Sequence, residues 1–339
     1  MDDKMLKTYV VSTRVRLARN LDGYPFPSRL TSEKQAKEII RKVSLGLNRV
    51  DEFKLYYMDA IDDEEADMLV ENHLISPVLL RNKHVSGALI NRENNVSVMI
   101  NEEDHLREQC IVKGLDLKLA YDTMSEIDAT ISKSLKFAYD EELGYLTACP
   151  TNLGTGLRAS VMMFLPALTI NGKMNRVISN VERLGLTVRG TFGEGSESLG
   201  YTYQISNEIT LGVKEEDVLD QVTAVVLKVV EMEREERENL KLGADAVHIK
   251  DKCLRSLGIL TNCALLSTRE FEELSYSVKL GVCLGYIKVD DVSEIDDLIT
   301  EMQPSNVNLL ASRRLSALER DIYRAEHVSK RFRKMLGGL

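Results

Sequence analysis

Residues 149–161 read CPTNLGTGLRASV, and the rest of the chain is organised around this stretch. The apolar run GYLTAC at 144–149 leads into it and predicts a strand. Gly154 and Gly156 predict a loop whose backbone can adopt positive φ angles. From Arg158 onward the apolar residues recur with a helical period, which predicts a helix. A strand–loop–helix corner that carries a thiol, free backbone N–H groups and an arginine is suited to binding an anion.

The composition limits the class of protein. The 339 residues suffice for two domains, and 44% apolar with 29% charged residues is ordinary for a globular protein. A net charge of -9 argues against nucleic acid as the main partner. No apolar run approaches the ~20 residues of a membrane span, and the first residues, MDDKMLKTYV, lack the apolar core of a signal peptide. Five cysteines without a CxxC pair or a metal-like spacing to the histidines predict a reduced, cytoplasmic location and no metal site.

A second arginine-bearing segment lies near the N-terminus. VVSTRVR at 10–16 predicts a strand, on which Ser12, Arg14 and Arg16 share one face. Two arginines side by side repel each other unless an anion lies between them. A solvated edge strand is the alternative, and this segment alone does not decide between the two.

Two further loops carry both acidic and basic residues. NEEDHLR at 101–107 follows two predicted strands, 87–91 and 96–100, and its carboxylates are expected at the mouth of a sheet. The alternative is a solvated helix N-terminus, where acidic residues are favoured by the helix dipole. RGTFGEGS at 189–196 is a glycine-rich loop with one arginine and one glutamate, a type of loop that can close over a ligand.

The remaining pattern predicts mixed structure followed by helices alone. Strands are predicted at 53–58, 186–189 and 201–205, and helices at 32–47, 62–74, 115–135, 173–184 and 215–240. The end of the last helix, EMEREEREN at 231–239, is so highly charged that we expect it to face solvent near a domain boundary. Beyond it, helices are predicted at 244–257, 268–280, 292–302 and 312–336.

Four of these motifs together resemble the phosphagen (ATP:guanido) kinase family. They are STRVR at 12–16, NEEDHLR at 101–107, CPTNLGTGLRASV at 149–161 and RGTFGE at 189–194, in the order in which the family carries them. Two features resemble the bacterial protein-arginine kinases of that family. We expect no helical domain before Ser12, and the helical C-terminal third contains RDIYRA, which is similar to their RDxxRA element.

The resemblance implies an α+β fold. An antiparallel sheet flanked by helices would form a catalytic domain over residues 1–240, and an all-helical domain over 241–339 would provide homodimer contacts and phosphoarginine binding. It also implies ATP and Mg²⁺ as cofactors, with the cation held mostly by phosphate oxygens and water.

The same resemblance assigns the nucleotide site. Guanidinium groups match phosphate oxygens and keep their charge, and the motifs give this task to Arg14, Arg16, Arg107, Arg158 and Arg189. The other ATP-binding residues that the motifs imply are Ser12, Thr13, Val15, His73, Ala159, Ser160, Val161, Met162, Gly190, Thr191, Phe192, Gly193 and Glu194.

Three residues are expected at the acceptor. The pKa of an arginine side chain lies above ~12, so its nitrogen is a poor nucleophile at neutral pH. The resemblance places Glu103 and Glu194 beside the acceptor guanidinium, to orient it or to accept its proton, and the choice between these roles stays open. Cys149 would lie against the same group, where nearby cations favour the thiolate, so we expect oxidation or alkylation to lower activity. The alternative is a buried, inert thiol.

The RDxxRA element implies a second binding site, with Arg320, Asp321, Arg324 and Ala325 as phosphoarginine ligands; an amphipathic helix with surface charges is the alternative. The implied function is ATP-dependent phosphorylation of protein arginines in stress response and protein quality control. The implied partners are a heat-shock repressor as substrate, a zinc-binding activator protein and a Clp-type unfoldase. A kinase for free arginine and a phosphoarginine-binding adaptor without activity stay open as alternatives.

Overall fold

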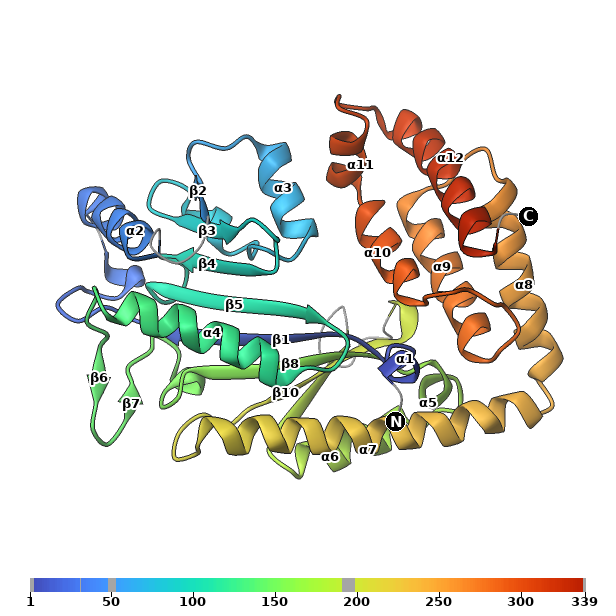
Figure 1. The fold of residues 1–339 in the computed structure, drawn as a ribbon, viewed down its shortest axis with the longest axis horizontal. Coiled ribbons are helices and arrows are strands. Elements are labelled where there is room, and N and C mark those ends of the chain that lie inside the picture. Colours follow the sequence, from blue (N-terminus) through green and yellow to red (C-terminus); the bar gives the residue numbers. More distant parts are fainter. Residues whose placement is uncertain (1–2, 31, 48–52, 191–198, 338–339) are drawn as a thin grey trace.

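The computed structural model describes residues 3–30, 32–47, 53–190 and 199–337. Its centre is an eight-stranded sheet in the order β2–β3–β4–β5–β1–β8–β10–β9 (Figure 1). All neighbouring strands are antiparallel, as predicted. The strands are β1 Val10–Arg19, β2 Phe53–Tyr57, β3 Gly87–Asn91, β4 Val96–Ile100, β5 Leu106–Lys113, β8 Leu157–Phe164, β9 Leu186–Gly190 and β10 Thr202–Asn207, with a separate pair β6 Tyr139–Asp140 and β7 Gly144–Tyr145.

Helices flank the sheet and then follow it in the chain. The helices that surround the sheet are α1 Asp3–Leu6, α2 Glu33–Leu47, α3 Asp63–Glu71, α4 Leu117–Ser132, α5 Pro166–Ile170, α6 Met174–Glu182 and α7 Glu215–Leu242. The helical part, residues 246–337, contains α8 Ala246–Asn262, α9 Thr268–Cys283, α10 Ser293–Glu301, α11 Pro304–Leu310 and α12 Ala317–Met335. Of these, α11 was not predicted, because its seven residues are too few to show a helical period.

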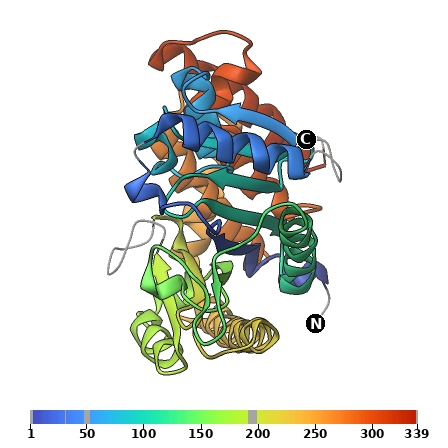
Figure 2. The same cartoon turned by 90° about the vertical axis from the view of Figure 1, so that its left-hand side faces the viewer.

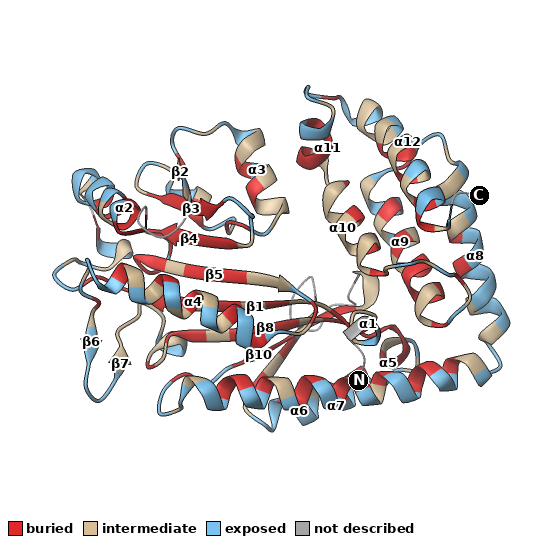
Figure 3. Cartoon of the chain, in the orientation of Figure 1, coloured by how far each residue is buried: buried red, intermediate tan, exposed pale blue. Residues whose placement is uncertain are grey.

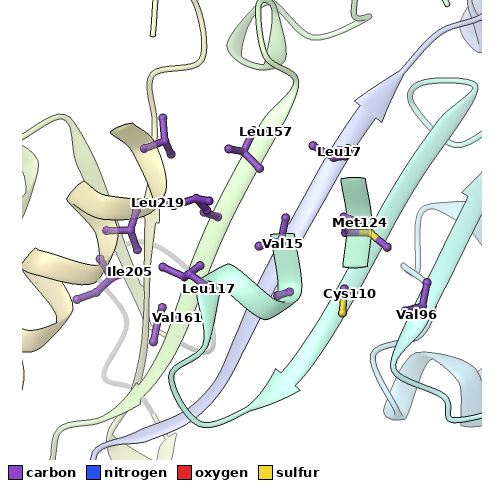
Figure 4. Packing of buried hydrophobic residues seen from close by; sticks show 14 of the residues in the cluster. Val15, Leu17, Val96, Cys110, Leu117, Met124, Leu157, Val161, Ile205 and Leu219 are labelled. Atoms are coloured by element: carbon purple, nitrogen blue, oxygen red, sulfur yellow. The ribbon is translucent and has the colours of Figure 1, made fainter. Parts of the chain in front are cut away.

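The alternation of side chains along β1 decides which face of the sheet is covered. Val15 and Leu17 point into the main hydrophobic core under α4, where they meet Leu157 of β8 and Met124 of α4 (Figure 4). Arg14 and Arg16 lie one residue out of step with these positions and therefore point to the opposite face. One face of the central strands is thus packed, and the other is left for a ligand.

The helix predicted from Arg158 onward is wrong, because this segment is strand β8 in the centre of the sheet. Ala159 and Val161 lie in the core, whereas Arg158 and Met162 alternate with them on the other face. The apolar residues of β8 are followed closely by those of the next helix, α5. The two elements in sequence imitate a helical period.

The prediction that 231–239 faces solvent is also wrong in part. Glu233, Glu236 and Arg237 are buried, although they belong to the most highly charged end of α7. Figure 3 shows buried positions along the length of this helix, and Figure 2 shows it nearly end-on beneath the strands (gold). The 28 residues of α7 extend beyond the sheet, so its last turns are covered by other elements on the side that the sheet does not reach.

The sheet and the helical part share a hydrophobic cluster. Phe164 of β8 and Ala167 of α5 belong to the same buried cluster as Phe271 and Val278 of α9. The Phe164 ring stacks on Tyr276 of α9, with centroids 6.4 Å apart. The helical part is therefore packed onto the end of the sheet.

Of the strand predicted at 144–149, only Gly144–Tyr145 is a strand, and it pairs with β6 outside the main sheet. Among the described residues, no helix combines the length and the apolar character needed to cross a membrane.

Candidate active site

A cleft of about 1170 Å³ lies over the face of the sheet opposite α4. Its floor is formed by β1, β5, β8 and β10. One wall comes from the segment after α3 and from 102–104, another from 149–152, and a third from α9 and α10 of the helical part. The glycine-rich stretch therefore contributes one wall of the cleft rather than the corner predicted for it.

The five predicted phosphate-binding arginines all line this cleft. Arg14 and Arg16 share a face of β1, and Arg16 is paired in register with Arg158 on the neighbouring strand β8. Arg107 comes from β5, opposite Ala18 of β1. Arg189, at the end of β9, is exposed. Four strands that are far apart in the sequence thus bring their guanidinium groups together.

These arginines repel one another in the absence of an anion. Burial, followed by the charges of Arg107 and Arg158, lowers the pKa of Arg14 to about 10. Burial also lowers the pKa of Arg16 well below its usual range, with Arg14 as the next contributor. The buried Nε of Arg16 has no hydrogen-bond partner among the described residues. A phosphate would provide both the missing acceptor and the missing negative charge.

Side chains that were not predicted orient three of the arginines. Nη1 of Arg107 donates to both carboxylate oxygens of Glu102 at 2.8 Å, and the Ser76 hydroxyl donates to the same carboxylate. Nη2 of Arg14 donates to Oε1 of Gln204 at 2.9 Å, and Nη2 of Arg158 donates to Oγ of Ser206 at 3.2 Å.

Two residues predicted to act on the acceptor lie at the same end of the cleft. Glu103 is largely exposed, but partial desolvation of its carboxylate, followed by the charges of Asp104 and Glu102, raises its pKa. Cys149 lines the cleft, with its Sγ 3.1 Å from Oγ1 of Thr151. Its reactivity stays a prediction.

Asp104 connects these two residues. Its Oδ1 accepts a hydrogen bond from the backbone N–H of Ala148 at 2.6 Å and from Nδ2 of Asn20 at 2.6 Å. Asp104 therefore fixes the backbone next to Cys149 relative to the segment that carries Glu103. The sequence signal for Glu102 and Asp104 was the run of three carboxylates, of which only Glu103 was predicted to have a role.

His73 lies in the cleft wall just after α3, in the left-handed region with φ of 59°. Its backbone carbonyl accepts a hydrogen bond from Nε2 of Gln109 at 2.7 Å, which holds the segment over β5. Burial, with a further contribution from Arg14, lowers the pKa of His73.

The structure does not bring all predicted ATP-binding residues to the cleft. Ser12, Ser160, Met162 and Gly190 line it. Val15, Ala159 and Val161 point into the core instead, and the buried Thr13 hydroxyl donates to the Gly114 carbonyl at 2.6 Å. These positions were included because they fall inside the motifs, yet alternation along β1 and β8 directs their side chains to the opposite face. The predicted residues Thr191, Phe192, Gly193 and Glu194 lie outside the described residues.

The residues predicted to bind phosphoarginine lie on α12. Arg324 is fully buried: its Nε donates to the Met302 carbonyl at 2.9 Å, and its Nη1 donates to the Leu266 carbonyl and to Asp321. Nη1 of Arg320 donates to the Leu315 carbonyl at 2.8 Å. Ala325 is buried. In this conformation Arg324 connects α12 to Met302 at the end of α10 and to Leu266 in the segment before α9.

Comparisons with known protein families and curated relatives agree over most of the chain. Residues 35–236 match the model for the ATP:guanido phosphotransferase C-terminal catalytic domain, and residues 246–337 match the protein-arginine kinase McsB C-terminal domain. The chain is 43% identical to a protein-arginine kinase of Caldanaerobacter subterraneus subsp. tengcongensis, over 97% of this chain and 98% of that protein. It is 41% identical to a protein-arginine kinase of Halothermothrix orenii, over 95% and 92% of the two chains.

Solved structures are similar in fold. A crystal structure of lombricine kinase matches with a TM-score of 0.60 and 28% identity, over 67% of each chain. The duplicated taurocyamine kinase from Schistosoma mansoni, with bound components of a transition-state analogue, matches with a TM-score of 0.63 and 30% identity, over 80% of this chain and 39% of that one.

Proposed function

The chain belongs to the ATP:guanido phosphotransferase family, and on that premise we propose that it transfers the γ-phosphoryl group of ATP to arginine side chains of proteins. The observation that carries the proposal is the convergence of five arginines on one cleft that has a carboxylate and a thiol at its end.

The arginines act on the phosphates. Phosphoryl transfer depends mainly on positioning and on neutralising the charge that spreads over the phosphate oxygens. The positive charges of Arg14, Arg16 and Arg158 lie close enough to repel one another. A negatively charged triphosphate between them removes this repulsion and is attracted by all three. Glu102 holds Arg107 in place through both carboxylate oxygens, so the guanidinium group is already oriented before ATP binds.

Glu103 acts on the acceptor. In the transfer step a bond forms between a guanidinium nitrogen and the γ-phosphorus, the bond to the bridging oxygen breaks, and ADP leaves with the electron pair. The proton of the attacking nitrogen passes to the carboxylate of Glu103. We propose Glu194 as the second carboxylate beside the acceptor and Cys149 as its thiol neighbour.

Mg²⁺ is the proposed partner of ATP. A hard cation of this kind is held mainly by phosphate oxygens and water, with one or two carboxylates. The cleft that holds the arginines is also lined by the carboxylates of Glu102 and Asp104, and oxygen ligands of this kind fit such a cation. The cation would neutralise part of the charge on the phosphates.

The raised pKa of Glu103 gives a test of its role. A base must be deprotonated to act, so kcat is expected to fall as the pH drops through a pKa above the usual ~4.3 of glutamate. Glu103→Gln is expected to remove this acidic limb and to lower kcat by about 10²–10⁴-fold, with little change in KM for ATP. pH–rate profiles of both proteins measure this. Glu126→Gln, on the exposed side of α4, should leave the profile unchanged. An acidic limb that persists in Glu103→Gln would assign the titration to another group.

The organisation of the chain is also part of the proposal. We propose residues 1–240 as the catalytic domain and 241–339 as a helical domain that provides homodimer contacts in a cytoplasmic, stress-response enzyme. Arg320, Asp321, Arg324 and Ala325 are proposed to bind phosphoarginine, which requires Arg324 to exchange its backbone partners for a phosphate. The proposed partners are a heat-shock repressor, a zinc-binding activator protein and a Clp-type unfoldase.

Mass spectrometry tests the activity directly. The full chain would be incubated with Mg-ATP and a mixed protein substrate, with free arginine in parallel, and the samples kept from acid because the N–P bond is acid-labile. Phosphate on protein arginines that is absent with Glu103→Ala supports the proposal. Phosphate on free arginine alone indicates a small-molecule kinase. No transfer to either, even with an activator protein added, favours a binding function.

A further inference from the structure

The cleft is longer than the catalytic residues require. Beyond the arginines it continues to a wall made by the helical part. The lining residues from this part are Tyr276, Ser293, Asp296, Asp297, Ile299 and Thr300. None of them belongs to the motifs that predicted the nucleotide site.

The strand register gives the order of the subsites along the floor. Ala18 of β1 lies opposite Arg107, near Glu103 and Cys149, at the acceptor end. Ser12 lies six residues away on the same strand, opposite Lys113 of β5 and Met162 of β8. At the rise of an extended strand this separation is roughly 20 Å, which suits an extended nucleoside triphosphate.

The charge changes along the same line. Carboxylates lie at the acceptor end, which suits a guanidinium, and the arginines occupy the middle, where Nε of Arg16 is buried without a partner and requires an anion. The γ-phosphate must face the acceptor, so the α-phosphate and the nucleoside extend in the opposite direction. That direction leads to Met162 on the floor and to α10 in the wall.

The wall is held firmly in place. Nζ of Lys113, at the end of β5, lies 2.6–2.7 Å from the carboxylate oxygens of Asp297 on α10. Asp296 is tied to the buried Lys279 at 2.6 and 2.7 Å, and the Lys279 ammonium lies 4.6 Å from the centroid of the Phe164 ring. Figure 1 shows the end of β5 directed toward α10.

Asp297 is the wall carboxylate with capacity for a ligand. Both carboxylates contact a lysine ammonium through both oxygens, but the side chain of Asp297 is 42% exposed, in contrast to 15% for Asp296. A carboxylate has about four acceptor positions, so the ion pair with Lys113 leaves some available. Carboxylates that accept hydrogen bonds from ribose hydroxyls are a recurrent feature of nucleotide sites.

We propose that the helical part completes the nucleotide site, with Asp297 accepting a hydrogen bond from the ribose 2′-hydroxyl of ATP. The inference rests on the proposed function for the orientation of the triphosphate. The catalytic half alone then binds the phosphates, and the helical half recognises the nucleoside.

The test compares the binding of three ligands to the full chain by isothermal titration calorimetry: ATP, 2′-deoxy-ATP and inorganic tripolyphosphate, each with Mg²⁺. The unmodified chain is expected to bind ATP about tenfold more tightly than 2′-deoxy-ATP, because the latter lacks one hydrogen bond to a charged group. Asp297→Ala is expected to reduce this ratio to about one and to leave tripolyphosphate binding unchanged.

Two control variants separate this contact from domain packing. Lys113→Ala removes the same ion pair but keeps the carboxylate, so the preference for ATP over 2′-deoxy-ATP should persist. Glu294→Gln, on the same helix but outside the cleft lining, should match the unmodified chain. Equal affinities of the unmodified chain for ATP and 2′-deoxy-ATP, or an unchanged ratio in Asp297→Ala, overturn the proposal.

Binding is measured without turnover, so the test is separate from that of the proposed activity. A preserved ATP preference without phosphoryl transfer would count against the activity and not against the nucleoside site. If Asp297→Ala changed only the KM for a protein substrate, the wall would bind the acceptor protein and the proposal would be overturned.

Discussion

Arg16→Met is expected to lower kcat/KM by about 10³-fold or more, and at the same time to raise the melting temperature of the ligand-free chain. The loss of activity follows from removing a guanidinium that neutralises the transferring phosphate. The gain in stability follows from the depressed pKa of Arg16, which means that the folded chain disfavours its charge. Methionine keeps the apolar stem and introduces no polar group that would need a partner.

Steady-state kinetics measure the loss of activity, and differential scanning calorimetry with and without ATP measures the change in melting temperature. A relief of 1 kcal/mol corresponds to an increase of roughly 1–2 °C for a chain of 339 residues, because the entropy of unfolding grows with chain length. ATP should stabilise the unmodified chain and have little effect on the variant. Arg176→Met, exposed on α6, provides a matched control that should change neither quantity. A variant that melts earlier and keeps its response to ATP would contradict the prediction.

Arg237→Ala is expected to reduce the free energy of unfolding by about 3–5 kcal/mol, because it removes one partner of a buried ion pair. Nε of Arg237 donates to Glu233 at 2.9 Å, and its Nη2 donates to the backbone carbonyl of Thr8 at 2.8 Å. Glu233 also accepts hydrogen bonds from the backbone N–H groups of Ala167 and Leu168. The pair therefore joins α7 to the start of α5 and to the segment before β1.

The pH dependence of this variant can be worked out from Glu233. Burial raises the pKa of its carboxyl, and Arg237 is the largest opposing influence. Without Arg237 the folded chain binds a proton more readily than the unfolded chain, so the stability of Arg237→Ala should rise as the pH falls toward 5. Urea denaturation at several pH values measures this. Glu233→Gln combined with Arg237→Met removes both charges and should recover part of the loss, whereas an equal deficit at every pH would argue against an uncompensated carboxylate.

The sequence predicted most of the sheet, because alternation is clear wherever one face is buried. On β1 it placed Arg14 and Arg16 on one face, and the structure confirms this position. It failed for β8, where the strand is followed closely by α5 and the apolar positions of the two elements merge into a helical period. The boundary has a signal in the sequence, Pro166 at the first turn of α5, which disfavours a helix that runs through it from Arg158.

The burial of Glu233 and Arg237 could not be predicted from local pattern either. Both residues lie in a highly charged run, EMEREEREN at 231–239, and such a segment normally faces solvent. Their burial depends on Thr8 and on the N-terminus of α5, which the fold brings to α7 from distant parts of the chain. Contacts of this kind are properties of the tertiary structure.

At the candidate site, the sequence identified the arginines that line the cleft and did not identify the residues that orient other groups of the site. The five arginines were identified through the family motifs, and their convergence follows from the strand order. Glu102, Asp104 and Gln204 were missed because their role is to orient another residue, and this requires knowing which atoms meet.

The hydrophobic cluster shared by Phe164, Ala167, Phe271 and Val278 limits how this protein can be recombined. A chimaera that joined residues 1–240 to the helical half of a distant relative would place a foreign surface against Phe164. The residues that the sheet and the helical part contribute to this cluster would have to be exchanged together.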